Sequence, residues 1–153
     1  MGRSGDPVLG RPHFSGSFEH SLDDKGRLVV PARFRERLGA SFFLTIGDPD
    51  PCLALYPAEK WGEFYDKLEA APAKDASYRD YVRHRFAHTE EISTDGNGRL
   101  IIPAHLRAWA GLDKDVVLLG AMAHVEIWAK ERYEQHVAAR GQLTDYTSAL
   151  GLF

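Results

Sequence analysis

A thirteen-residue segment occurs twice in this chain, and the duplication constrains the fold more than any other feature. The segment spans residues 23–35 and returns at residues 95–107, an offset of 72, with seven of the 13 positions identical. The shared residues are an Asp, a Gly-Arg-Leu triplet, a Pro-Ala pair and a final Arg. A repeat this specific indicates two copies of one structural unit, each too small to bury its apolar faces alone.

Each copy of the segment predicts a turn, a short strand and the start of a helix. Asp and Gly favour a turn, because Gly adopts positive φ at little cost. The apolar run Leu28–Val30, with its two β-branched valines, is typical of a strand, and Pro31 suits the first position of a helix. The residues predicted to shape the two turns are Asp23, Gly26, Asp95 and Gly98.

The repeat extends beyond the motif, over roughly residues 14–61 and 86–133. We expect a strand before each turn, at residues 14–21 and 86–93, which forms a hairpin with the strand after the turn. Periodicity predicts further strands at 42–46, 53–56, 116–120 and 125–128, and helices at 77–86 and 130–140.

Composition narrows the class of protein. No run of 18 apolar residues occurs and residues 1–13 lack the apolar segment of a secretory signal, so we expect a cytosolic chain without a membrane partner. Cys52 is the only cysteine, which excludes an intrachain disulfide, and we expect it to be buried as a small hydrophobe.

Charge is unevenly distributed. The net charge of −3 argues mildly against general nucleic-acid binding, yet residues 23–38 carry five basic against three acidic side chains. Arg27 and Arg99 directly follow the turn glycines, where a hairpin needs no arginine. Each arginine could pair with Asp23 or Asp95 in solvent, and such an exposed pair would contribute only about 0 to 1 kcal/mol to stability. Alternatively, the two basic loops could bind DNA phosphates or guanine edges.

Several blocks of this sequence resemble the MraZ family. The family pattern Phe-x-Gly appears as Phe14–Gly16, and its Leu-Asp-x-Lys-Gly-Arg-Leu-x-x-Pro motif as Leu22–Pro31. Further matching blocks are Cys52–Pro57, Asp95–Pro103 and Val125–Trp128. The sequence departs from the family where 13 residues precede Phe14, about 12 more than usual, and where Asn97 stands in place of a common Gln.

The resemblance implies a mixed α+β fold of two tandem AbrB-like swapped-hairpin β units, which form a pseudo-two-fold β-barrel with peripheral helices. In chain order, the resemblance implies a disordered extension (1–13), a first AbrB-like repeat with its helix (14–72), a linking helix (73–85), a second repeat with its helix (86–140) and a mobile tail (141–153).

The resemblance further implies a sequence-specific DNA-binding transcriptional regulator of the division and cell-wall gene cluster. Members bind short direct repeats in double-stranded promoter DNA and assemble into homo-oligomeric rings, which implies a nucleoid-associated protein. By position, the implied DNA-contacting residues are Lys25, Arg27, Arg99, Arg33 and Arg35. Arg35 and Arg107 recur in both copies and could equally be structural, each pairing with Asp23 or Asp95.

Two other classes of function are weighed against this one. The same scaffold could be an antitoxin-like protein-interaction module, with the aromatic helices as its partner surface. An enzyme or metal protein is disfavoured: His84 and His88 are four residues apart but lack a full coordination set. We therefore expect no cofactor, no metal, no small-molecule substrate and no catalytic residues.

Overall fold

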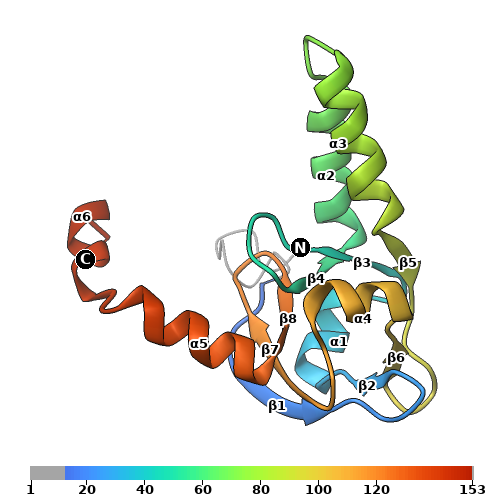
Figure 1. The fold of residues 1–153 in the computed structure, drawn as a ribbon, viewed down its shortest axis with the longest axis vertical. Coiled ribbons are helices and arrows are strands. Elements are labelled where there is room, and N and C mark those ends of the chain that lie inside the picture. The colour runs from blue at the N-terminus through green and yellow to red at the C-terminus, as the bar shows by residue number, and fades with distance from the viewer. Residues whose placement is uncertain (1–12, 153) are drawn as a thin grey trace, which may run out of the picture.

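The computed structural model describes residues 13–152 of the chain, which fold into a mixed α+β structure (Figure 1). This confirms the predicted class. The predicted disorder of residues 1–13 concerns, apart from His13, a segment outside the described residues.

Most elements follow the sequence pattern. The strands are β1 (Ser17–Ser21), β2 (Arg27–Val29), β3 (Phe42–Ile46), β4 (Leu53–Pro57), β5 (Glu90–Ile92), β6 (Arg99–Ile101), β7 (Asp115–Gly120) and β8 (Val125–Ala129). The helices are α1 (Ala32–Leu38), α2 (Ala58–Glu69), α3 (Ala76–Ala87), α4 (Ala104–Ala110), α5 (Lys130–Arg140) and α6 (Thr144–Leu150).

The strands form two separate sheets. A six-stranded antiparallel sheet has the order β1-β7-β8-β4-β3-β5, and β2 pairs with β6 in a two-stranded ribbon. Because the edge strands β1 and β5 do not pair with each other, the sheet is not closed, and the predicted β-barrel is wrong. The chain leaves each edge strand through a motif turn and then enters the ribbon.

The hairpin predicted within each repeat is also wrong. The strands on either side of the first turn, β1 and β2, pair with β7 and β6, which belong to the other repeat. Likewise, β5 of the second repeat pairs with β3 of the first. The two halves exchange strands, so neither half forms its sheet alone.

The strand registers are related by an internal pseudo-two-fold axis. Leu28 lies opposite Leu100 in the ribbon, and Ala54 lies opposite Glu126 in the large sheet. In each pair the partners are separated by the repeat offset of 72 residues. Exchanging the repeats reverses the strand order and leaves the sheet unchanged, so the duplication in sequence has become a symmetry of the fold.

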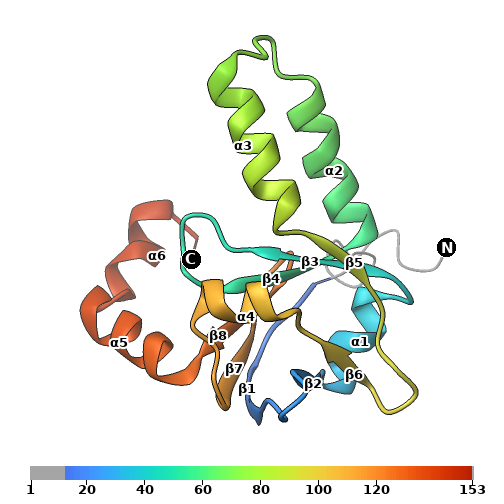
Figure 2. The ribbon, with the colours of Figure 1, turned by 45° about the vertical axis from the view of Figure 1, so that its right-hand side comes forward.

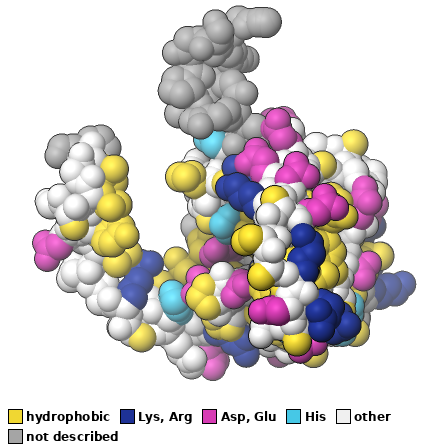
Figure 3. All heavy atoms as spheres, turned by 90° about the horizontal axis from the view of Figure 1, so that it is seen from above, with side chains coloured by type: hydrophobic (Ala, Val, Ile, Leu, Met, Phe, Trp, Pro, Cys, Tyr) yellow, Lys and Arg dark blue, Asp and Glu magenta, His cyan; other side chains and the backbone are white. Residues whose placement is uncertain are grey.

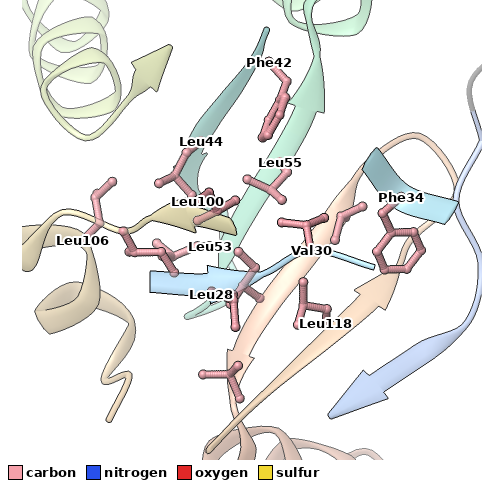
Figure 4. Packing of buried hydrophobic residues seen from close by; sticks show 14 of the residues in the cluster. Leu28, Val30, Phe34, Phe42, Leu44, Leu53, Leu55, Leu100, Leu106 and Leu118 are labelled. Carbon is pink, nitrogen blue, oxygen red and sulfur yellow. The ribbon is translucent and has the colours of Figure 1, made fainter. Parts of the chain in front are cut away.

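The hydrophobic core lies between the ribbon and the large sheet (Figure 4). Leu28 and Leu100 point inward from the ribbon and are 0% and 1% exposed. Leu53, Leu55 and Leu118 of the large sheet are fully buried in the same cluster. Packing against these leucines covers the inner face of a ribbon that is too short to be stable alone.

Helices α2 and α3 form a hairpin that projects from the large sheet, away from the ribbon (Figures 1 and 2). Arg85 anchors the base of this hairpin: it is 5% exposed, donates to Thr45 Oγ1 at 3.2 Å, and lies over the ring of Phe64 at 5.1 Å.

Helix α3 continues to Ala87, so the strand predicted from residue 86 is only Glu90–Ile92. The helix is favoured there because the Phe86 ring packs 5.7 Å from that of Trp61.

The C-terminal segment contains a short helix, α6, that the sequence pattern does not predict. Together with α5 it forms an arm, and Figure 3 shows apolar side chains on the side of the arm that faces the body. Tyr146 and Leu150 are 64% and 54% exposed. The predicted mobility of this tail stays a prediction.

Two smaller expectations concern exposure to solvent and to lipid. Cys52 is fully buried, as predicted, and burial raises the pKa of its thiol. Among residues 13–152, no helix combines the length and apolar character needed to cross a bilayer.

Truncation inside the ribbon tests whether its inner face carries the fold. Leu28→Ala should lower the free energy of unfolding by about 2–5 kcal/mol, because it leaves a cavity in a closed core. Val29→Ala, one residue later at a side chain that is 41% exposed, should change it by about 0.5 kcal/mol or less. Chemical denaturation measures both; equal losses would contradict the inward packing of Leu28.

Candidate nucleic-acid interface

Asp23 organises the first motif turn. Its Oδ1 atom accepts hydrogen bonds from the backbone N–H groups of Lys25 and Arg27, both at 2.9 Å. The N–H of Gly26 donates to the Asp23 carbonyl at 3.0 Å, and Gly26 has a φ of +76°. A left-handed conformation of this kind favours glycine, which explains the Asp-x-x-Gly-Arg pattern physically.

The second turn repeats this geometry. Asp95 Oδ1 accepts from the N–H groups of Asn97 at 2.8 Å and Arg99 at 2.9 Å. Gly98 has a φ of +74°, and its N–H donates to the Asp95 carbonyl at 3.0 Å. The two turns are therefore the same structure built twice.

Each turn aspartate also orients the arginine that follows the glycine. Arg27 Nε donates to Asp23 Oδ2 at 2.5 Å, and Arg99 Nε donates to Asp95 Oδ2 at 3.0 Å. Among residues 13–152, no side chain or backbone group forms a hydrogen bond with the terminal Nη atoms of either arginine. An exposed ion pair of this kind adds little stability, but it fixes the direction of the guanidinium group.

The aspartates are ionised under all ordinary conditions. The N–H of Arg27 stabilises the Asp23 carboxylate and lowers its pKa to about 2. The N–H of Arg99 likewise lowers the pKa of Asp95. Both carboxylates therefore remain charged hydrogen-bond acceptors at neutral pH.

The two arginines lie on the outer face of the β2–β6 ribbon. Arg27 is opposite Ile101, and Val29 is opposite Arg99. Because side chains alternate along a strand, these four residues share the face that points away from buried Leu28 and Leu100. The result is a surface with two arginines on one diagonal and two β-branched residues on the other, at the end of the molecule opposite the α2–α3 hairpin (Figure 2).

Lys25 lies in the turn that leads into the ribbon, whereas Arg33 lies against Phe18 of β1. Lys25 is exposed in the first turn, at the position that Asn97 occupies in the second. Arg33 is exposed on α1 and its guanidinium lies 5.8 Å from the ring centroid of Phe18.

Arg35 and Arg107 support the turns of the opposite repeat. Arg35 donates from Nε to the Val30 carbonyl at 2.9 Å, and its guanidinium lies against Gly98. Arg107 hydrogen-bonds to the Ile102 carbonyl through Nη1 and lies against Gly26. No ion pair joins Arg35 or Arg107 to either turn aspartate among the described side chains, so the pairing weighed from the sequence is replaced by packing on glycine.

The histidine pair weighed as a metal site packs instead with its neighbours. His88 Nδ1 lies 2.7 Å from the His84 carbonyl, and the His88 ring is 5.8 Å from that of His105. In the part of the chain that the structure describes, no group of three or more His, Cys, Asp or Glu side chains could hold a metal ion.

Sequence reasoning located both turns and missed the apolar half of the outer face. Val29 and Ile101 are 41% and 61% exposed, although their sequence context suggests only a strand. The sequence does contain a signal for these two residues: side chains alternate along a strand, so the residue two positions after each arginine lies on the same face.

The fold and the site define a class of protein that is built from two copies of one unit, whose Asp-x-x-Gly-Arg turns lead into one symmetric two-stranded ribbon. The family model described as "MraZ protein, putative antitoxin-like" matches the chain twice, over residues 13–84 and 85–149. The chain belongs to the MraZ family.

Curated relatives agree over most of the chain. The "Transcriptional regulator MraZ" of Moorella thermoacetica is 45% identical over 123 residues, which cover 80% of this chain and 85% of the relative. The protein of that name from Heliobacterium modesticaldum is 46% identical over the same shares. The one from Clostridium tetani is 39% identical over 142 residues, which cover 91% of this chain and 99% of the relative.

Replacing a turn glycine tests the packing between repeats. A Cβ atom on Gly98 would lie 2.6 Å from Arg35 Nη1, and its φ of +74° strains any side chain. Gly98→Ala should lower the free energy of unfolding by about 1–3 kcal/mol. Gly96→Ala is the matched control, because a Cβ there meets nothing within 4 Å. Equal stability of the two variants would refute the contact.

Acid titration tests the role of Asp23. Its pKa is lowered from 3.8 to about 2, so its contribution to the folded turn is complete above pH 4 and is lost as the pH falls through about 2. Carboxyl NMR should show a midpoint near pH 2, with matching shifts at the Lys25 and Arg27 amides. In Asp23→Asn those amide shifts should vanish; a wild-type midpoint near 3.8 would contradict the hydrogen-bonded turn.

Proposed function

We propose that this chain is a sequence-specific DNA-binding transcriptional regulator that reads double-stranded DNA with the outer face of the β2–β6 ribbon. The observation that carries the proposal is the diagonal pair Arg27 and Arg99, each held by its turn aspartate through Nε, which leaves the terminal nitrogens without a hydrogen-bond partner among the described residues. The relatives' name, transcriptional regulator, supports the same conclusion.

The mechanism follows from the geometry of guanidinium groups. A two-stranded ribbon fits the major groove of B-DNA, where an arginine can donate two hydrogen bonds to guanine N7 and O6. An arginine already fixed at Nε loses less side-chain entropy when its Nη atoms bind. Arg27 and Arg99 therefore contact guanine edges or phosphates, and Lys25 neutralises a nearby phosphate.

The remaining arginines have different parts in this proposal. Arg33 is exposed on α1 and flanks the DNA as a phosphate contact. Arg35 is half-buried and bound to the Val30 carbonyl, so it acts by positioning the Gly98 turn. The chain needs one basic face only, which is compatible with a net charge of −3.

The proposed target is a set of short direct repeats in the promoter of the division and cell-wall gene cluster, bound by a homo-oligomeric ring. Support comes from the resemblance of the motifs to the family. A ring places several ribbons along several repeats, and linked contacts multiply the affinity of each weak one. This implies a cytoplasmic, nucleoid-associated protein without an enzymatic activity or a cofactor.

A protein-interaction module is the second candidate, and the α2–α3 hairpin favours it. The hairpin projects from the body and carries Tyr65 with a 48% exposed side chain. Figure 3 views the molecule from the hairpin end, where acidic and basic side chains are mixed, as is common for protein surfaces. The "antitoxin-like" description of the family model is compatible with such a partner.

DNA binding by arginine variants distinguishes the two candidates. Fluorescence anisotropy on the DNA upstream of the chain's own gene should show preference over a scrambled duplex, with affinity that falls steeply as salt rises. Arg27→Ala and Arg99→Ala should each weaken binding by about 1–3 kcal/mol, because each removes a bidentate base contact.

Arg83→Ala is the matched control. It removes one positive charge from α3, where Arg83 pairs with Asp80 in solvent, and should bind DNA like the wild type. Light scattering must show equal oligomer mass for all variants. Wild-type protein without sequence preference would favour the interaction module, and equal losses in Arg83→Ala and Arg27→Ala would indicate only a general charge effect.

A further inference from the structure

The outer face of the ribbon contains an apolar pair between its arginines. Val29 and Ile101 are 41% and 61% exposed, while the intervening core residues Leu28 and Leu100 are almost fully buried. Register places Val29 opposite Arg99 and Ile101 opposite Arg27. The four side chains thus alternate, arginine and β-branched, around the pseudo-two-fold axis.

Packing within this chain does not account for the exposure of this pair. Single exposed apolar residues are common and need no explanation. Here, two such residues are related by the internal symmetry and lie directly across the ribbon from the residues that the proposed function directs at DNA. Their methyl groups would enter the groove with the guanidinium groups.

The chemistry of the major groove supplies a partner for a methyl group. Guanine presents two acceptors there, which suit arginine, whereas thymine presents a C5-methyl group that side-chain methyls contact favourably. We propose that Val29 and Ile101 contact thymine methyl groups beside the guanines read by Arg27 and Arg99, and so help to determine the sequence that the ribbon prefers. This inference rests on the proposed function.

The two contacts are unequal. Ile101 has one more methylene group than Val29 and is more exposed, so it offers more apolar area to the groove. Ile101 should therefore contribute the larger share of the discrimination for thymine.

Replacing thymine by deoxyuridine tests the contact, because deoxyuridine lacks only the methyl group. The duplex upstream of the chain's own gene is prepared with thymidine or with deoxyuridine throughout. Anisotropy then measures binding of the full chain and of Val29→Ala, Ile101→Ala and the double variant. Loss of each buried methyl contact should weaken wild-type binding about fourfold, so loss of both should weaken it about fifteenfold. Met122→Ala, at a 78% exposed apolar side chain outside the ribbon, is the control.

The inference requires that the loss of affinity on deoxyuridine depends on the side chains of Val29 and Ile101. The double variant should bind the two duplexes equally well, whereas the wild type and Met122→Ala should prefer the thymidine duplex. Equal preference in wild type and double variant would overturn the inference, because deoxyuridine would then act through DNA shape. Specific wild-type binding without any loss on deoxyuridine would also overturn it and leave the proposed function standing; absence of preference for upstream over scrambled DNA would overturn both.

Discussion

Pairing of β2 with β6 is the interaction on which the rest of the structure depends. It joins two segments 72 residues apart, and two further hydrogen bonds extend it: Val30 N–H to the Gly98 carbonyl and Ile102 N–H to the Gly26 carbonyl, both at 2.9 Å. Each turn glycine is thereby bound to the end of the other repeat's strand. A ribbon of two three-residue strands has little stability in water alone, so it persists only because its inner leucines complete the core.

The same pairing also determines what the molecule displays. Period-two alternation divides each short strand into one residue for the core and two for solvent. Burial of Leu28 therefore fixes the outward direction of Arg27, and the turn aspartate then fixes its guanidinium group. In this way stability and the proposed DNA contact depend on the same backbone hydrogen bonds, although they use opposite faces of the ribbon.

Much of the fold is predictable from sequence, because the motif contains strong local signals. Gly at positive φ, Pro at a helix start and β-branched runs define the turns, the motif helices and most strands. Strand partners were not predictable, since the hydrogen-bonding groups of β1 are equally satisfied by β2 or by the other repeat. Helix α3 extends into a predicted strand because Phe86 packs on Trp61, a contact remote in sequence. The packing of Arg35 on Gly98 is likewise visible only once the repeats meet.

The symmetry of the ribbon is approximate, so its two halves present different side chains. A homodimer presents two identical edges and cannot distinguish the two ways of lying on a palindrome. Here duplication within one chain has allowed the halves to diverge: Lys25 corresponds to Asn97, and Val29 to the bulkier Ile101. Such a surface has two distinguishable ends, so a duplex bound to it as proposed would be read in one orientation.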